Sequence, residues 1–383
     1  GTFDFSKAPY VKHTPIHWMF DVEINPHNPD HAMFVTGYGG YETFDLTNAA
    51  EEKPTLWQVM STGIEETVAL DLLSPPEGAP IITAIGDYGG FVHWDIDQPV
   101  SEGNFDNPHF GNTNSVDCAW QNPEIIVRVG IASHHTGSAH IGYSLDSGKS
   151  WQAPASTPQP ESKLGHIAVS ANGKTWVWTP EKSQPYFTKD LGKSWHQVKG
   201  LPENTRVLAD RNNPMKFYAM SLFEGKLFIS DDGGKNFVSQ DLVLPEGLHD
   251  NKGNRGDSRG GQDRLYAAPD TEGDLWLAAF NGLYHSTDEG KTFKQTKGVE
   301  ELHAFGFGKA APKSDYSALY MVGIVNGVRG VFRSDNIGQN WIRINDDEHE
   351  WGLLLHITGD PKKYGRVYVG THGRGTIYGD RAE

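Results

Sequence analysis

The sequence lacks several features that mark common functional classes. It has one cysteine, Cys118, among 383 residues, so it cannot form an internal disulfide, and we expect this position to be a small buried side chain. No apolar run approaches the roughly 18 residues that a membrane-spanning helix needs. Neither a phosphate-binding Gly-x-x-x-x-Gly-Lys-Ser/Thr loop nor a Gly-x-Ser-x-Gly nucleophile motif occurs. The sequence therefore gives no sign of a membrane span, a P-loop or a serine-hydrolase site.

Positive charge is also scarce. The 33 basic residues stand against 49 acidic ones, which gives a formal charge of −16 with no basic block. This balance speaks against nucleic acids and anionic membranes as partners. The pair His134-His135 adjoins a Gly/Ser loop and lacks metal-ligand spacing, so we expect surface histidines, no metal and no cofactor. Eleven Trp and fourteen Tyr are many for this length, and exposed rings on an acidic protein suit stacking on sugars.

One motif, Ser/Thr-x-Asp/Asn-x-Gly-x-x-Trp/Phe, occurs five times. Asp and Gly between strand-like runs predict a tight hairpin, in which Gly takes a positive φ and Asp binds its own loop backbone. We expect these acids to be structural rather than calcium ligands, and the aromatic residue to pack between repeats. The start-to-start spacings of 44, 42, 56 and 48 residues are typical of propeller blades. The copies begin at Ser144, Thr188, Ser230, Ser286 and Ser334.

The strand pattern predicts an all-β fold, a single seven-bladed β-propeller with Asp-box hairpins over residues 1–383. A closing segment, 353–380, is expected to complete the ring with the first repeat or to pair with a partner domain. Segment 246–263 interrupts the period and reads as an inserted, exposed loop that either covers one end of the ring or is a tolerated insertion. The repeats are expected to start near residues 19, 67, 115, 166, 206, 264 and 302.

One hairpin differs in kind from the others. In Ile85-Gly-Asp87-Tyr-Gly-Gly-Phe91 an acid sits between glycines, directly after the apolar strand 81–85. We expect the glycines to leave the Asp87 carboxylate exposed and to let a bulky ligand approach the backbone. Such an acid is a candidate proton donor, and the alternative is a simple turn residue.

Hydrolysis of a glycosidic bond would need a second carboxyl group, about 6.5–9.5 Å from the first in an inverting enzyme. The sequence does not identify it. Asp95 and Asp97 follow on the outgoing strand and are expected to face solvent. Glu65 and Glu66 precede the second repeat and are open candidates, with hydrogen bonding to inner-strand backbone groups as the alternative role.

The segments Gly63-Ile-Glu-Glu-Thr67 and Gly86-Asp-Tyr-Gly-Gly-Phe-Val-His93, with the ending Gly365 to Asp380, resemble glycoside hydrolase family 74. These enzymes are xyloglucan-cleaving endo-β-1,4-glucanases and related oligoxyloglucan hydrolases. The resemblance runs from about Trp18 to Asp380. It implies two propellers with the substrate cleft between them, of which this chain is the second, so the first propeller is expected outside it.

The resemblance further implies an inverting mechanism with Asp87 as general acid, acting on xyloglucan or a related β-glucan in a secreted or extracytoplasmic enzyme. The base belongs to the first propeller, because Tyr38-Gly-Gly-Tyr41 has the glycines of the related motif without an acid. Aromatic platforms are expected in the cleft, with packing between blades as the competing interpretation. Our candidates are Trp18, Tyr38, Tyr88 and Trp351.

Two other function classes remain open at this stage. A non-catalytic propeller that binds glycan or protein is favoured if no second acid exists. A sialidase is suggested only by the repeated Asp motif, and the arginine cluster that would hold a sugar carboxylate is not evident. A sortilin-type receptor would need a cysteine-rich module, which a chain with one cysteine does not contain.

Overall fold

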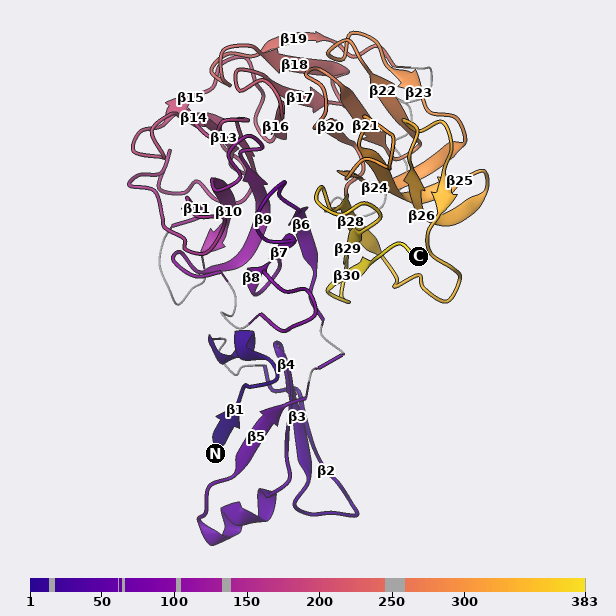
Figure 1. The fold of residues 1–383 in the computed structure, drawn as a ribbon. Coiled ribbons are helices and arrows are strands. Elements are labelled where there is room, and N and C mark those ends of the chain that lie inside the picture. The colour runs from indigo at the N-terminus through magenta and orange to yellow at the C-terminus, as the bar shows by residue number, and fades with distance from the viewer. Residues whose placement is uncertain are drawn as a thin grey trace.

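The structure is a computed structural model that describes residues 1–13, 18–60, 62–63, 66–100, 105–132, 139–244 and 259–382. Two parts are visible in Figure 1: a ring of sheets, and a smaller N-terminal sheet that extends from the ring on the side of β7 and β8. Helical structure in the described residues is limited to two short 3-10 helices, η1 (Pro9–His13) and η2 (Leu46–Glu51). None of the described helices is long and apolar enough to cross a membrane.

Seven antiparallel sheets make up the ring, and in each the strands follow one another in chain order. The first three are β6 (Ala69–Leu73), β7 (Ile81–Ile85) and β8 (Gly89–His93); β9 (Phe110–Cys118), β10 (Ile126–Ala132) and β11 (Ile141–Ser144); and β12 (His166–Val169), β13 (Trp176–Thr179), β14 (Tyr186–Thr188) and β15 (His196–Gln197).

The remaining four sheets continue around the ring in the same way. They are β16 (Val207–Ala209), β17 (Phe217–Ser221), β18 (Lys226–Ser230) and β19 (Val238–Asp241); β20 (Arg264–Ala267), β21 (Leu275–Ala279), β22 (Gly282–Ser286) and β23 (Lys294–Gln295); β24 (Val299–Gly308), β25 (Ala318–Val325), β26 (Val328–Ser334) and β27 (Ile342–Arg343); and β28 (Leu354–Gly359), β29 (Val367–Thr371) and β30 (Thr376–Gly379).

The ring closes where its first and last sheets meet. Strand β28 contacts β24 on one side and β6 on the other. A bridge joins Val68 to His372, and the amides of Gly373 and Gly375 donate to the Thr67 carbonyl at 3.1 and 3.2 Å. The chain therefore completes the ring by contacts between residues about 300 positions apart in sequence.

The repeated motif forms the expected hairpin loops. Asp146 accepts hydrogen bonds from the Ser144 hydroxyl at 2.7 Å and the Ser150 amide at 2.9 Å. The Ser144 hydroxyl in turn accepts the Gly148 amide at 2.8 Å. Each Asp side chain thus accepts hydrogen bonds from groups of its own turn that have no partner on a neighbouring strand, which is a structural role. The same pattern recurs at Asp190, Asp232, Asp288 and Asn336.

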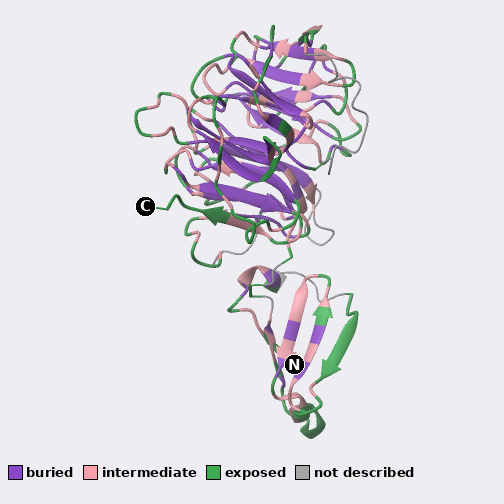
Figure 2. Cartoon of the chain, turned by 90° about the vertical axis from the view of Figure 1, so that its right-hand side faces the viewer, coloured by how far each residue is buried: buried purple, intermediate pink, exposed green. Residues whose placement is uncertain are grey.

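Hydrophobic clusters between neighbouring sheets hold the ring together, and much of the ring is buried (Figure 2). Strands β7, β13, β21 and β29, each the second strand of its sheet, are buried throughout. The motif aromatics belong to these clusters: Phe237 packs with Phe187 and Phe217, and Phe293 packs with Leu227. The prediction that these side chains pack between repeats is therefore confirmed. Cys118 is fully buried and has no disulfide partner, as expected.

The N-terminal sheet is built from β1 (Thr2–Asp4), β2 (Asp21–Ile24), β3 (Ala32–Thr36), β4 (Gly39–Thr43) and β5 (Leu56–Val59) in the order β1-β5-β4-β3-β2. Strand β1 runs parallel to β5, and the other pairs are antiparallel. Its inner end packs on the ring through one cluster that contains Phe34 and Tyr41 from the sheet and Ile85, Tyr88 and Phe91 from the β7–β8 hairpin.

The observed sheets differ from the expected repeats at both ends of the chain. The repeat expected near residue 19 is not a blade of the ring. Its strands belong to the N-terminal sheet, whose five strands pair with one another, including β1 with β5, and, among the described residues, with no strand of the ring. The closing segment 353–380 forms a sheet of its own, β28 to β30, beside β6. Most of the inserted loop 246–263 lies outside the described residues, and Gly261 donates its amide to Leu355 at 2.8 Å.

Candidate functional site

The hairpin between β7 and β8 presents Asp87 to solvent. Five buried apolar or small residues in β7 fix the hairpin in the ring, and the turn ends the strand at Gly86. Asp87 has a φ of 65°, and its amide donates to the Asn112 side-chain oxygen at 2.7 Å. Within the described part of the chain the structure shows no hydrogen bond to the Asp87 carboxylate. Its backbone is therefore fixed while its carboxyl group is exposed, as expected from the sequence.

The glycines that follow Asp87 have a different role from the one expected. Gly89 and Gly90 are buried and do not line an open path to the backbone. A Cβ at Gly89 would lie 2.7 Å from the Phe110 carbonyl oxygen, and one at Gly90 would lie 2.0 Å from the Thr83 carbonyl oxygen. The glycines therefore allow close strand packing beneath Asp87, so the interpretation that they admit a ligand is corrected.

Tyrosine rings connect this hairpin to the N-terminal sheet. The buried Tyr88 donates its hydroxyl to the Tyr38 carbonyl at 2.7 Å, and the two ring centroids are 5.1 Å apart. Tyr10 meets Tyr88 edge to face at 5.3 Å. Burial, and then the charge of Asp87, raise the pKa of the Tyr38 phenol, which keeps it neutral beside the carboxylate. Tyr88 is therefore a packing residue, whereas the half-buried Tyr38 lies beside Asp87.

Trp18 stands at the same junction and is exposed over 68% of its surface. Its ring lies against Gly37, where an added Cβ would come within 3.0 Å of the indole. Gly37 precedes Tyr38 in the turn between β3 and β4. The structure thus gathers Trp18, Tyr38, Tyr88 and Asp87 in one region, with Trp18 offering the open aromatic face.

Trp351 lies on the neighbouring part of the ring. It is half-buried against the cluster around Leu354 and lies 5.7 Å from the His349 ring. A chain of backbone contacts joins it to the hairpin: Leu353 accepts the His372 amide, His372 bridges Val68, and Val68 accepts the Gly86 amide. Trp351 therefore lies at the same end of the sheets as Asp87. It does not belong to the group of aromatic residues near Asp87.

The candidate second acids separate into three groups. Asp97 accepts the Tyr378 hydroxyl, and Asp95 caps the Asp97 amide at 2.9 Å, so both exposed side chains belong to the outgoing end of β8. Glu66 is exposed just before the ring begins. Glu65 and the pair His134-His135 lie outside the described residues. Across the described ranges, no group of three His, Cys, Asp or Glu side chains is arranged to hold a metal ion.

Asn112 and Tyr10 are site residues that sequence reasoning missed. Asn112 comes from β9 and Tyr10 from η1, and each meets the hairpin only after the sheets assemble. No motif surrounds either residue, so the sequence carried no signal for them.

His93, six residues after Asp87, makes the stability of this hairpin sensitive to acid. Its ring lies 3.1 Å from the Thr83 hydroxyl, and burial lowers its pKa to about 4. Between pH 6.5 and 4 the unfolded chain therefore binds a proton that the folded state resists, and stability falls as pH falls. The free energy of unfolding of the wild type should therefore decrease between pH 7.5 and pH 5. In His93→Gln we expect that decrease to be smaller by about 2 kcal/mol. Urea titrations at both pH values measure this difference.

The matched control for that experiment is His27→Gln, at an exposed position in the loop between β2 and β3. It should follow the wild-type pH dependence. Equal acid sensitivity of His93→Gln and the wild type would show that His93 does not remain neutral in the folded protein.

Comparison with known proteins gives a consistent result over the whole chain. A xyloglucanase from Paenibacillus sp. is 39% identical over 388 residues, which cover 99% of this chain and 36% of that protein. The crystal structure of a GH74 xyloglucanase from Xanthomonas campestris superposes with a TM-score of 0.89 at 37% identity, covering 100% of this chain and 53% of the other. The resemblance to glycoside hydrolase family 74 is confirmed. No family model matches the chain.

The match to family 74 proteins concerns only part of their length. This chain spans about half of the solved relative and a smaller share of the curated one. The β-propeller domain of Cps50 (Swd1) from Myceliophteria thermophila, at 9% identity and a TM-score of 0.52, covers 82% of this chain and 98% of that one. That likeness supports the propeller fold alone.

Proposed function

We propose that this chain is the C-terminal half of a xyloglucan hydrolase and supplies its general acid, Asp87. The observation that carries the proposal is the placement of Asp87: an exposed carboxyl group on a buried hairpin, beside Tyr38, whose turn also carries the exposed ring of Trp18. The similarity to xyloglucanases across 99% of the chain supports the choice of substrate. The polymer is too large to enter cells, so the protein is expected to be secreted or extracytoplasmic.

In the proposed inverting reaction, protonated Asp87 donates its proton to the glycosidic oxygen as the bond to the anomeric carbon breaks. Water attacks the opposite face of the sugar and gives its proton to a second carboxylate about 6.5–9.5 Å away. Asn112 holds the turn so that the acid keeps its position, and Trp18 stacks on a backbone glucose. Trp351 is proposed to contact a more distant sugar.

The second carboxylate is proposed to come from a first propeller that docks on the N-terminal sheet. Strand β2 is an edge strand with all four residues exposed, so its outer backbone groups are open to another chain. Large apolar side chains accompany it, and an apolar patch of this kind marks an interaction surface. They are Met19, Phe20, Val22 and Ile24, each exposed over at least 55% of its surface.

Reconstitution tests this function. We expect release of reducing sugars from tamarind-type xyloglucan only when the chain is combined with its N-terminal propeller, and product sizing then gives the pattern of cleavage. Activity of this chain alone would place the second acid within it, with Glu65 and Glu66 as the first residues to replace. Glycan binding without product in either sample would support the alternative, a non-catalytic glycan- or protein-binding propeller.

A further inference from the structure

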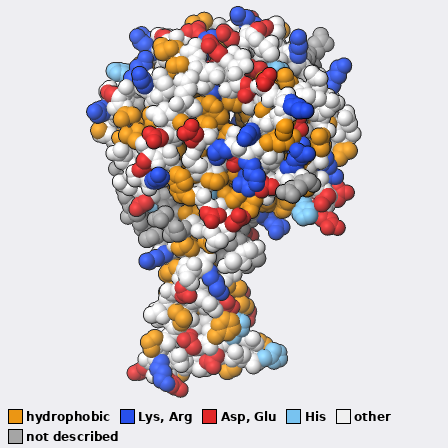
Figure 3. Space-filling view, viewed as in Figure 1, with side chains coloured by type: hydrophobic (Ala, Val, Ile, Leu, Met, Phe, Trp, Pro, Cys, Tyr) orange, Lys and Arg blue, Asp and Glu red, His pale blue; other side chains and the backbone are white. Residues whose placement is uncertain are grey.

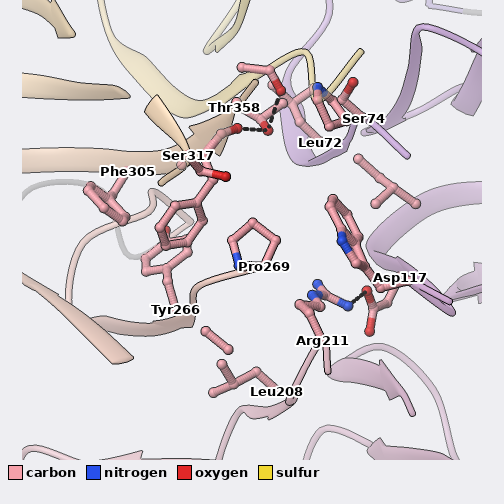
Figure 4. A pocket seen from close by; sticks show the side chains of 18 of the residues that line it. Leu72, Ser74, Asp117, Leu208, Arg211, Tyr266, Pro269, Phe305, Ser317 and Thr358 are labelled. Carbon is pink, nitrogen blue, oxygen red and sulfur yellow. Dashed lines mark hydrogen bonds and ion pairs between the residues drawn. The ribbon is translucent and has the colours of Figure 1, made fainter. Parts of the chain in front are cut away.

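A cavity of about 400 Å³ lies at the centre of the ring, away from the site described above (Figure 4). The innermost strands of the sheets, β6, β9, β12, β16, β20, β24 and β28, all contribute residues to its wall. Asp87 and the four candidate aromatic residues do not line it. The cavity is therefore a separate feature of the molecule.

Most carboxylates of this cavity already have partners. Asp117 pairs with Arg211 at 2.8 Å, as Figure 4 shows, and also accepts the Val169 amide at 2.8 Å. Asp270 accepts both the amide and the hydroxyl of Ser317, at 2.9 and 3.1 Å. These acids tie neighbouring blades together. The charge of Asp117 is balanced by Arg211. Asp270 keeps its negative charge, but no ion pair joins it to an arginine of the cavity among the described residues.

Two arginines share the one remaining lining acid. Arg206 lies 4.0 Å from Asp71, which itself accepts the amides of Leu72 and Val116. Arg264 donates to the Arg259 carbonyl at 3.1 Å, and the structure shows no carboxylate in hydrogen-bond contact with it among the described residues. Burial, and then the charge of Arg206, lower the pKa of Arg264 to about 10. Two crowded guanidinium groups thus face a single carboxylate.

Two histidines lie near this basic cluster: His356 lines the cavity, and His166 directly precedes the lining residue Ile167. Burial and then the charges of Arg206 and Arg264 hold the pKa of His166 well below its usual range, and His356 is part of the same environment. The Nδ1 atom of His166 is buried and has no hydrogen-bond partner among the described residues. An excess of positive charge at the core of a chain with a formal charge of −16 is unusual. On the face seen in Figure 3, Lys and Arg side chains also gather near the middle of the ring.

From this arrangement we propose that the central cavity binds a small oxyanion of the phosphate or sulfate type between Arg206 and Arg264. Guanidinium groups match oxyanions with paired N–H donors, and an anion replaces the missing counter-charge. The site joins Arg206, at the start of β16, to Arg264 of the neighbouring strand β20, so the bound ion is expected to stabilise the ring.

Thermal unfolding of the full chain, alone or with its partner propeller, tests the proposal. Sodium phosphate or sulfate should raise the melting temperature saturably at millimolar concentrations, whereas sodium chloride at equal ionic strength should not. Arg206→Gln and Arg264→Gln should each weaken the apparent affinity at least tenfold. The control Arg329→Gln changes an exposed arginine paired with Glu301 and should respond as the wild type does. An equal response to chloride, or unchanged affinity in both cavity variants, overturns the proposal.

Two further measurements add to this test. Without anion, relief of like-charge repulsion should leave Arg264→Gln at least as heat-stable as the wild type, and a clear loss of stability would contradict the proposal. Selenate soaked into wild-type crystals at low millimolar concentration should give an anomalous peak between the two arginines. A cavity without that peak contradicts the proposal whatever the variants do.

Discussion

Asp87→Asn in the reconstituted enzyme should lower kcat on xyloglucan by about 1,000-fold, because a side-chain amide cannot protonate the leaving oxygen. The hairpin should keep its position, since the backbone amide of residue 87 still donates to Asn112. An aryl glycoside with a good leaving group needs little protonation, so the variant should lose far less activity on it. Steady-state rates on the two substrates, with circular dichroism as a check of folding, measure this difference.

Asp231→Asn is the matched control for that prediction. Asp231 is exposed and directly follows β18, the third strand of its sheet, whereas Asp87 precedes β8, the third strand of another sheet. The two residues therefore lie at opposite ends of their sheets, and the Asp231→Asn substitution should leave both rates unchanged. Wild-type turnover by Asp87→Asn would eliminate Asp87 as the acid. Equal losses on both substrates would instead indicate that residue 87 positions substrate without donating a proton.

Gly90→Ala should produce the largest loss of stability in this region, about 3–5 kcal/mol in the free energy of unfolding. Gly90 has a φ of 140°, and a Cβ would lie 2.0 Å from the Thr83 carbonyl and 2.6 Å from the Phe105 ring. Both obstacles are buried, so the strand pair must separate to accept the methyl group. Equilibrium urea unfolding measures the loss.

Gly111→Ala provides the comparison, because nothing lies within 4 Å of the Cβ position and the backbone there is not left-handed. It should cost less than about 1 kcal/mol. If Gly90→Ala were equally mild, the close packing of β7 on β8 beneath Asp87 would be disproved. The same outcome would restore the interpretation that these glycines serve ligand access.

The local sequence predicted the elements of the ring. Each motif turn could be read from its own residues because Asp146 and its counterparts bond within four positions of themselves. The same holds for Asp87, whose exposure follows from a turn directly after an apolar strand. The general-acid role of Asp87 and the missing base came from the resemblance to family 74, and they stay predictions.

Errors arose where pairing is long-range. Residues 19–45 have the strand pattern of a blade, but the parallel pairing of Thr2–Asp4 with Leu56–Gln58 assigns them to another sheet. Nothing in either segment signals that partner, because any extended strand offers the same backbone groups. The burial of Gly89 and Gly90 was likewise misjudged, since the atoms that crowd them come from Thr83, Phe105 and Phe110.

The sequence by itself determined the repeat, the hairpin turns and the exposed acid at a strand end, because each depends on contacts between residues a few positions apart. Only the tertiary structure placed Asn112 under Asp87, brought Tyr38 beside it with Trp18 on the same turn, and brought Arg206 and Arg264 to one cavity. These groups come from separate strands or turns. Their proximity exists only after the sheets pack, since ring closure sets distances that no local pattern encodes.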